Sequence, residues 1–282
     1  MQRLEAAHEF IDGPLDDHAT VVENLRDLRR ANRWLGGAAL SRSALIRLVM
    51  GAYGGPMRRR FDWRHGPLRV LDVGTGSADI PEALLGWAEQ RHLPIEIDAV
   101  DSREEIIAAA FDLIEDRPGL RLDIADVKSL RYRDASYDVV HCSLLLHHLD
   151  PDEAVTALRE MRRVCRLGIV INDLDRRPWA LLGAWVLGHV FAYRRYSRHD
   201  APMSVRRAYR PAEVAQLAAR AGLVEALRVR GFAGHRYAIA FVPVEVGAAA
   251  DRGEIADAPP ERSDNRVPDE SRNVRVTRRP RS

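Results

Sequence analysis

The sequence feature that most constrains the fold is a regular alternation of short apolar runs with helical stretches, which begins at Leu68. Strands are predicted over residues 68–73, 95–100, 120–124, 137–142 and 168–171, and helices between them over 78–90, 103–114 and 152–164. Strands that alternate with helices form βαβ units, in which the strands run parallel and helices cover both faces of the sheet. The chain is therefore predicted to be an α/β protein with a doubly wound sheet.

Further elements flank this alternation on both sides. Apolar residues recur at helical spacing over 17–35 and 38–50, which predicts two helices ahead of the first strand. Towards the end of the chain, helices are predicted over 178–193 and 211–221, and two strands over 223–230 and 236–242. The short link between those strands requires that they be antiparallel. We divide the chain into a helical preface or lid (1–62), a central domain (63–244) and a tail (245–282), whose low hydrophobicity favours disorder.

The composition excludes several classes of protein. Of the 282 residues, 46% are hydrophobic and 30% charged, as in an ordinary folded protein. The 43 basic and 41 acidic residues leave a net charge of only +2, so no nucleic acid or anionic membrane is expected as partner. Two cysteines, Cys142 and Cys165, and a first segment without an apolar core predict a cytoplasmic protein. The apolar run Trp179–Tyr193 is shorter than the roughly twenty residues of a membrane-spanning helix, which favours a helix that is buried or covers an apolar substrate.

The segment from Val70 to Asp79 is the most informative about chemistry. It reads Val-Leu-Asp-Val-Gly-Thr-Gly-Ser-Ala-Asp, which predicts a strand, a tight glycine turn and the start of a helix. A dinucleotide-binding turn has Gly or Ala at the sixth position counted from Gly74, where this chain has Asp79. That carboxylate and Asp72 would oppose a pyrophosphate, and no Gly-Lys-Ser/Thr follows for a phosphate loop. S-adenosyl-L-methionine (SAM) has no phosphate and carries a sulfonium and an ammonium group, so acids around a glycine turn favour it.

Two more acids follow the next predicted strands. Asp101 ends the second strand, 27 residues after Gly74, where a carboxylate can accept hydrogen bonds from ribose hydroxyls. Asp126 follows the third strand and could contact the adenine amine. Together with Leu71–Gly76 and the stretch Tyr137–Leu149, these residues resemble the class I SAM-dependent methyltransferases. The resemblance is to their small-molecule branch, of quinone and polyketide type (methyltransferase type 11-like), and covers roughly residues 68–242.

This resemblance implies a Rossmann-like sheet of seven strands whose last strand is reversed, with the cofactor at the carboxyl ends of strands one to four. It assigns the methionine end of SAM to Asp72, Gly74 and Gly76, the ribose to Asp101, and the adenine to Asp126 and Val127. Thr75, Ser102 and Ser143 complete the expected cofactor set. Ala78 departs from the family pattern, which usually has a third glycine there.

Methyl transfer is an in-line displacement, in which the enzyme aligns the two reactants and sometimes removes a proton. The candidate catalytic residues are His199, His147, Asp173 and Asp200. His199, expected in a loop, is the first choice as base because Asp200 or Asp173 could stabilise its imidazolium form; the alternative is an ordinary polar loop. His147 is second, because it could instead pack on the cofactor, and His141 is expected to be structural. No metal site is expected, since these histidines lie in no zinc-binding motif.

The function expected from the sequence is methyl transfer to a hydroxyl or an activated carbon of a hydrophobic small molecule, such as a phenolic polyketide or a quinone. The helix over 179–193 would cover this acceptor with Trp185 and Val186, unless it only completes the core. Two alternatives stay open. One is an RNA or protein methyltransferase, against which the balanced charge argues, and the other is a non-catalytic SAM-binding protein. The sequence does not predict the oligomeric state.

Overall fold

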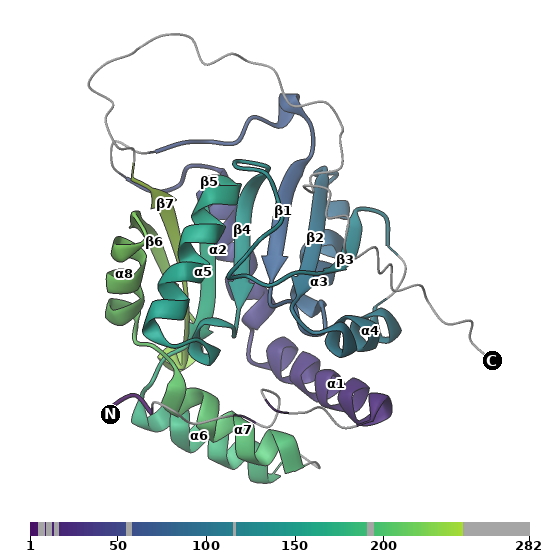
Figure 1. Cartoon of the computed structure of the whole chain (residues 1–282), viewed down its shortest axis with the longest axis vertical. Coiled ribbons are helices and arrows are strands. Elements are labelled where there is room, and N and C mark those ends of the chain that lie inside the picture. The colour runs from purple at the N-terminus through teal and green to yellow at the C-terminus, as the bar shows by residue number, and fades with distance from the viewer. Residues whose placement is uncertain are drawn as a thin grey trace, which may run out of the picture.

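A computed structural model describes residues 1–4, 9, 13, 17–54, 58–114, 117–190 and 195–244 of the chain (Figure 1). The predicted tail, 245–282, lies outside these residues. The side chains at 185–190, 195–199 and 232 also lie outside the description, and they include those of Trp185, Val186 and His199.

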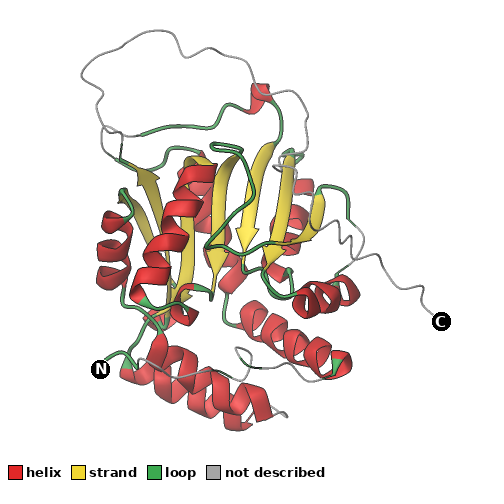
Figure 2. Cartoon of the chain, viewed as in Figure 1, coloured by secondary structure: helices red, strands yellow, loops and turns green. Residues whose placement is uncertain are grey.

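A sheet forms the centre of the molecule, with helices around it (Figure 2). It has seven strands in the order β3-β2-β1-β4-β5-β7-β6. The strands β1 to β5 are parallel to one another, whereas β7 is antiparallel to both β5 and β6. The predicted α/β class, the doubly wound sheet and its reversed last strand are thereby confirmed. The strands are β1 (Leu68–Val73), β2 (Ile95–Asp101), β3 (Leu120–Ile124), β4 (Tyr137–Ser143), β5 (Cys165–Leu174), β6 (Leu223–Arg230) and β7 (Arg236–Pro243).

Helices cover both faces of the sheet because the central strands carry apolar residues on both faces. In β1, Leu71 packs with a cluster that includes residues of α5 (Pro151–Val164) and α8 (Pro211–Arg220). Val70, on the other face, packs with residues of α2 (Gly37–Val49) and α3 (Asp79–Glu89). The preface helix α2 therefore belongs to the core of the sheet and contacts β5, β6 and β7.

Three helices lie beyond the carboxyl ends of the parallel strands (Figure 1). They are α1 (His18–Trp34), α6 (Pro178–Val190) and α7 (Arg195–Arg207). Helix α1 packs against α4 (Glu104–Leu113), α2 and α7, and α6 packs against α7. No helix among the described residues is long and apolar enough to cross a membrane.

Two sequence-based boundaries are wrong. His199 and Asp200 were expected in a loop but lie in α7, which continues through Pro202. Proline lacks a backbone N–H and normally interrupts a helix, so the pattern indicated a loop. Strand β5 is longer at both ends than predicted, so Asp173 lies within the strand and not after it.

Candidate functional site

The glycine turn follows β1 at the carboxyl edge of the sheet. Gly74 and Gly76 have positive φ angles of 65° and 53°, which glycine adopts without steric cost. A side chain at Gly74 would place its Cβ 2.8 Å from Leu145, so close packing requires a glycine there. At Gly76 a Cβ would meet nothing within 4 Å, so this part of the turn faces open space. The hydroxyl of Thr75 is buried and has no hydrogen-bond partner among the described residues. The turn thus offers room and an unused polar atom to a ligand.

Asp101 connects the end of β2 to this turn. Its Oδ2 accepts the backbone N–H of Gly76 at 3.2 Å, and its Oδ1 accepts that of Arg103 at 3.3 Å. Burial raises the pKa of the Asp101 carboxyl, although these N–H donors act in the opposite direction. A carboxylate offers about four acceptor positions. The two backbone bonds therefore leave capacity for ligand hydroxyls, and the exposed Ser102 is adjacent.

Asp126 and Val127 follow β3 at the same edge. Asp126 is exposed, and its Oδ1 accepts the N–H of Lys128 at 2.9 Å, which shapes the turn. Val127 is buried against the apolar cluster on the α5 face. The structure therefore brings an apolar and a carboxylate group to the end of β3, next to the end of β2 in the sheet.

Asp72 has a different environment from the rest of the predicted cofactor set. Its side chain is buried, and Oδ1 lies 2.5 Å from Nδ1 of His141. The other nitrogen of His141 lies 2.8 Å from the hydroxyl of Ser41 in α2. Asp72 is thus connected through His141 to Ser41 of α2. His141 is buried and both of its ring nitrogens have partners, which is typical of a structural residue.

A buried arginine extends this polar network to the preface helices. Arg236 at the start of β7 donates hydrogen bonds to Asn172 at 2.6 Å, to Asn32 at 2.7 Å and to Ser143 at 2.7 Å. Asn172 in turn donates to the hydroxyl of Ser41 at 2.6 Å. Burial lowers the pKa of Arg236 to about 10, although the charges of Asp173 and Asp79 act in the opposite direction. The network ties α1 and α2 to β4, β5 and β7, and it engages the hydroxyl of Ser143.

A buried histidine–aspartate pair lies at the ends of β4 and β5. His147 belongs to η3 (Leu146–His148), and its Nδ1 lies 2.7 Å from Oδ1 of Asp173. The structure therefore brings together two of the predicted catalytic residues. Burial raises the pKa of the Asp173 carboxyl, but the positive charge and hydrogen bond of His147 outweigh it, so the pKa lies below its usual value. The second oxygen, Oδ2, is buried without a hydrogen-bond partner among the described residues.

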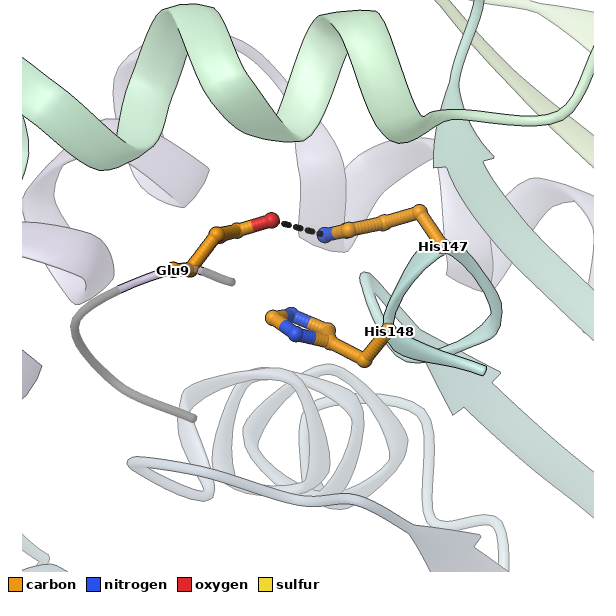
Figure 3. A group of neighbouring side chains, drawn as sticks. All are labelled: Glu9, His147 and His148. Atoms are coloured by element: carbon orange, nitrogen blue, oxygen red, sulfur yellow. Dashed lines mark ion pairs between the residues drawn. The ribbon is translucent and has the colours of Figure 1, made fainter. Parts of the chain in front are cut away.

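The other side of His147 faces Glu9, a residue that sequence reasoning missed (Figure 3). Glu9 is buried, and its Oε1 lies 3.8 Å from Nε2 of His147. The hydroxyl of Ser204 in α7 donates to Oε2 of Glu9 at 2.6 Å, and Arg207 lies 3.8 Å from Oε1. A single acid ahead of the first helix carries no pattern that would identify it from sequence.

The second predicted pair lies on α7. The backbone carbonyl of Asp200 accepts a hydrogen bond from the Ser204 hydroxyl at 2.9 Å, so the residue helps to hold the helix that contacts Glu9. The side chain of His199 lies outside the described residues. The structure therefore gives the surroundings of His147, and the catalytic roles of His147 and His199 both stay predictions.

Comparisons with known proteins concern the family and the fold of the chain. Residues 70–168 match a family model described as a methyltransferase domain. No curated protein sequence matches the chain. The fold resembles human N-acetylserotonin methyltransferase solved with SAM, with 13% identity, a TM-score of 0.57, and coverage of 81% of this chain and 57% of that one. This chain therefore spans little more than half of the human protein.

Two further solved structures are covered in full by this chain. A SAM-dependent methyltransferase from Aquifex aeolicus has 16% identity and a TM-score of 0.52, over 82% of this chain and 100% of that chain. A complex of the Haloferax volcanii Trm112 methyltransferase activator with a methyltransferase gives 15% identity and a TM-score of 0.53, over 83% and 100%. Residues 70–168 therefore match a methyltransferase domain, and the chain that carries them has the fold of solved SAM-dependent methyltransferases.

Proposed function

We propose that the chain is an enzyme that transfers a methyl group from SAM to a hydroxyl or an activated carbon of a hydrophobic small molecule, of the phenolic polyketide or quinone type. The observation that carries this proposal is the position of the buried His147–Asp173 pair at the same sheet edge as the open glycine turn. SAM, when bound, supplies a methyl group on a positively charged sulfur. The residues of this chain hold it, orient the acceptor and accept a proton.

The cofactor would lie along the ends of β1, β2 and β3. Gly74, Thr75 and Gly76 would receive its methionine part, since the turn has open space and an unused hydroxyl. Asp101 and Ser102 would bind the ribose, and Asp126 and Val127 the adenine. Asp72 and Ser143 would hold the site in shape, because Asp72 is hydrogen-bonded to His141 and Ser143 to Arg236.

For a hydroxyl acceptor, His147 would take the proton as the methyl group moves. Asp173 accepts a hydrogen bond at Nδ1, which leaves Nε2 as the proton acceptor and stabilises the imidazolium that forms. An acceptor carbon activated by its own ring would need alignment alone. His199 is the other candidate for the base.

A small apolar acceptor is supported by α6, whose sequence is almost wholly apolar and which lies beyond the carboxyl ends of the strands (Figure 1). One structural neighbour is also named for a small-molecule acceptor, N-acetylserotonin. The net charge of +2 disfavours RNA. A cytoplasmic location stays a prediction.

The test is a SAM titration by calorimetry, followed by a turnover screen with phenols, quinols and bulk RNA. We expect SAM binding and methylation of one of the first two classes. NADH binding tighter than SAM would refute the cofactor, methylation of RNA alone would refute the acceptor class, and binding without any turnover would favour a non-catalytic protein.

A further inference from the structure

One imidazole lies between two buried carboxylates in this site. The distances are 2.7 Å from Asp173 Oδ1 to Nδ1 of His147 and 3.8 Å from Glu9 Oε1 to Nε2. All three side chains are at most 3% exposed. Water screens such charges little, so their attraction for a proton on the ring is stronger than at the surface.

Each side of the ring faces a carboxylate. Glu9, with Arg207 beside it, faces Nε2, and Asp173, which also interacts with the charge of Arg236, faces Nδ1. A carboxylate close to an imidazole stabilises the charged form of the ring. From this position opposite Nε2 we propose that Glu9 is a positioning residue for methyl transfer, which stabilises the imidazolium of His147 as the acceptor loses its proton. The inference rests on the proposed function.

Glu9 is held in place by its own contact with α7. The Ser204 hydroxyl of this helix donates to its Oε2 at 2.6 Å. The first residues of the chain bind the end of the same helix: the N–H of Leu4 donates to the carbonyl of Arg206 at 3.0 Å, and Arg3 donates to the carbonyls of Arg207 at 2.8 Å and Leu149 at 3.0 Å. Helix α7 thus fixes the Glu9 carboxylate opposite His147.

Methyl transfer to a hydroxyl moves a methyl group to the acceptor oxygen and a proton to His147. The acceptor oxygen bonds to the methyl carbon while the bond from that carbon to sulfur breaks, and the sulfur keeps the electron pair. The hydroxyl proton moves to Nε2 of His147, which becomes an imidazolium between Asp173 and Glu9. Carboxylates that are already in position therefore stabilise the positive charge that develops on His147 in the transition state.

A metal ion is the alternative occupant of this cluster. Glu9, His147 and His148 offer ligand atoms within 4.8 Å of one another, and a ligating histidine often donates its second nitrogen to a carboxylate, as His147 does to Asp173. However, the guanidinium of Arg207 lies beside Oε1 of Glu9, and Ser204 engages Oε2. Arg207 repels a doubly charged metal ion more strongly than a singly charged imidazolium, so these contacts favour a proton.

The titration of His147 depends on every charged or titratable group around it. Glu9, Asp173 and His148 lie against its ring, and Arg207 lies beside Glu9. Cys142 of β4 and Arg236 and Tyr237 of β7 interact with the charge of Asp173. Of these, Glu9 is the one whose charge faces Nε2 and can be removed by an isosteric substitution.

The experiment measures the protonation of His147 directly, by NMR of the full chain with labelled histidine. The His147 signal among the ten histidines is assigned by its loss in His147→Gln. In Glu9→Gln we expect the titration midpoint of His147 to fall by about one pH unit, because a neighbouring carboxylate favours the charged ring. Glu9→Asp, which keeps the charge, should restore most of the shift, and the exposed Glu96→Gln should leave the midpoint unchanged.

An unchanged midpoint in folded Glu9→Gln would overturn the proposal. Ser204→Ala is the second variant, for use if Glu9→Gln fails to fold. It removes only the hydroxyl that holds Glu9, and we expect it to lower the titration midpoint of His147 by a smaller amount. An unchanged midpoint in this variant would also overturn the proposal. One metal ion per purified chain, lost in Glu9→Gln and His148→Gln, would show a metal site instead. The measurement needs neither SAM nor an acceptor, so a chain that binds no SAM refutes the proposed function without altering this result.

Discussion

Replacing Asp101 by asparagine tests the cofactor site most directly. The substitution keeps the shape of the side chain at the end of β2 and one oxygen, which can still accept the N–H of Gly76 in the glycine turn. It removes the negative charge and half of the acceptor capacity that would face the ribose. The turn should therefore keep its conformation while the contact with the ligand weakens.

The size of the effect follows from the kind of bond lost. A hydrogen bond to a charged group contributes about 1.5–3 kcal/mol, and about 1.4 kcal/mol corresponds to a tenfold change in affinity. Asp101→Asn should therefore weaken SAM binding by roughly ten- to a hundredfold. Calorimetry measures this, with Asp112→Asn, an exposed carboxylate on α4, as the matched control.

The pH dependence adds a second check. Burial raises the pKa of Asp101, so its carboxylate is protonated at a higher pH than an exposed aspartate. If the ribose needs the ionised form, SAM affinity should fall on acidification in the wild type and much less in Asp101→Asn. Equal SAM affinity of the two proteins at neutral pH would refute the assignment of Asp101.

Four further outcomes are expected. Arg236→Met should lower the free energy of unfolding by about 3 kcal/mol, since two buried acceptors and a partly buried one lose their donor, and urea denaturation measures it. Because the pKa of Asp173 is lowered in the folded state, its contribution to stability is present above the unfolded value of about 3.9 and is lost as the pH falls through the folded value. The difference in unfolding free energy between wild type and Asp173→Asn should therefore shrink below about pH 4, and a pH-independent difference would contradict this. His147→Gln should reduce turnover at least a hundredfold with SAM affinity retained; a comparable loss in His199→Ala alone would assign the base to α7. Deletion after Val246 should leave the melting temperature and SAM binding unchanged, and a large drop in melting temperature would show that the tail packs on the domain.

The alternation of strands and helices was predictable because the local signals agree with one another. The bounds of β1 and β6 coincide with the apolar runs over 68–73 and 223–230, and glycine and proline separate the elements. Helix α7 was not predictable. Pro202 locally indicates a break in the helix, and the packing of this segment on α6 and α1 overrides that preference.

The residues of the site were predictable only where a single segment of the sequence contains the whole motif. The glycine turn and Asp101 meet that condition, since a strand ends at each of them. The contacts of Asp72 with His141 and of Glu9 with His147 join residues 69 and 138 positions apart, and neither member of a pair identifies the other in a single sequence. The partner of Asp72 became evident only when the register of β1 and β4 placed the two residues opposite each other.

The network around Arg236 has a consequence for how the chain unfolds. The sequence suggested a boundary near residue 62, but Asn32 and Ser41 lie before it and bond to side chains of β4, β5 and β7 after it. A fragment that starts at residue 63 would leave a buried guanidinium and a buried imidazole facing water on one side of its sheet. We therefore expect the preface and the sheet to open as one cooperative unit in hydrogen exchange, so that the amides of α2 and β7 exchange with the same free energy of opening.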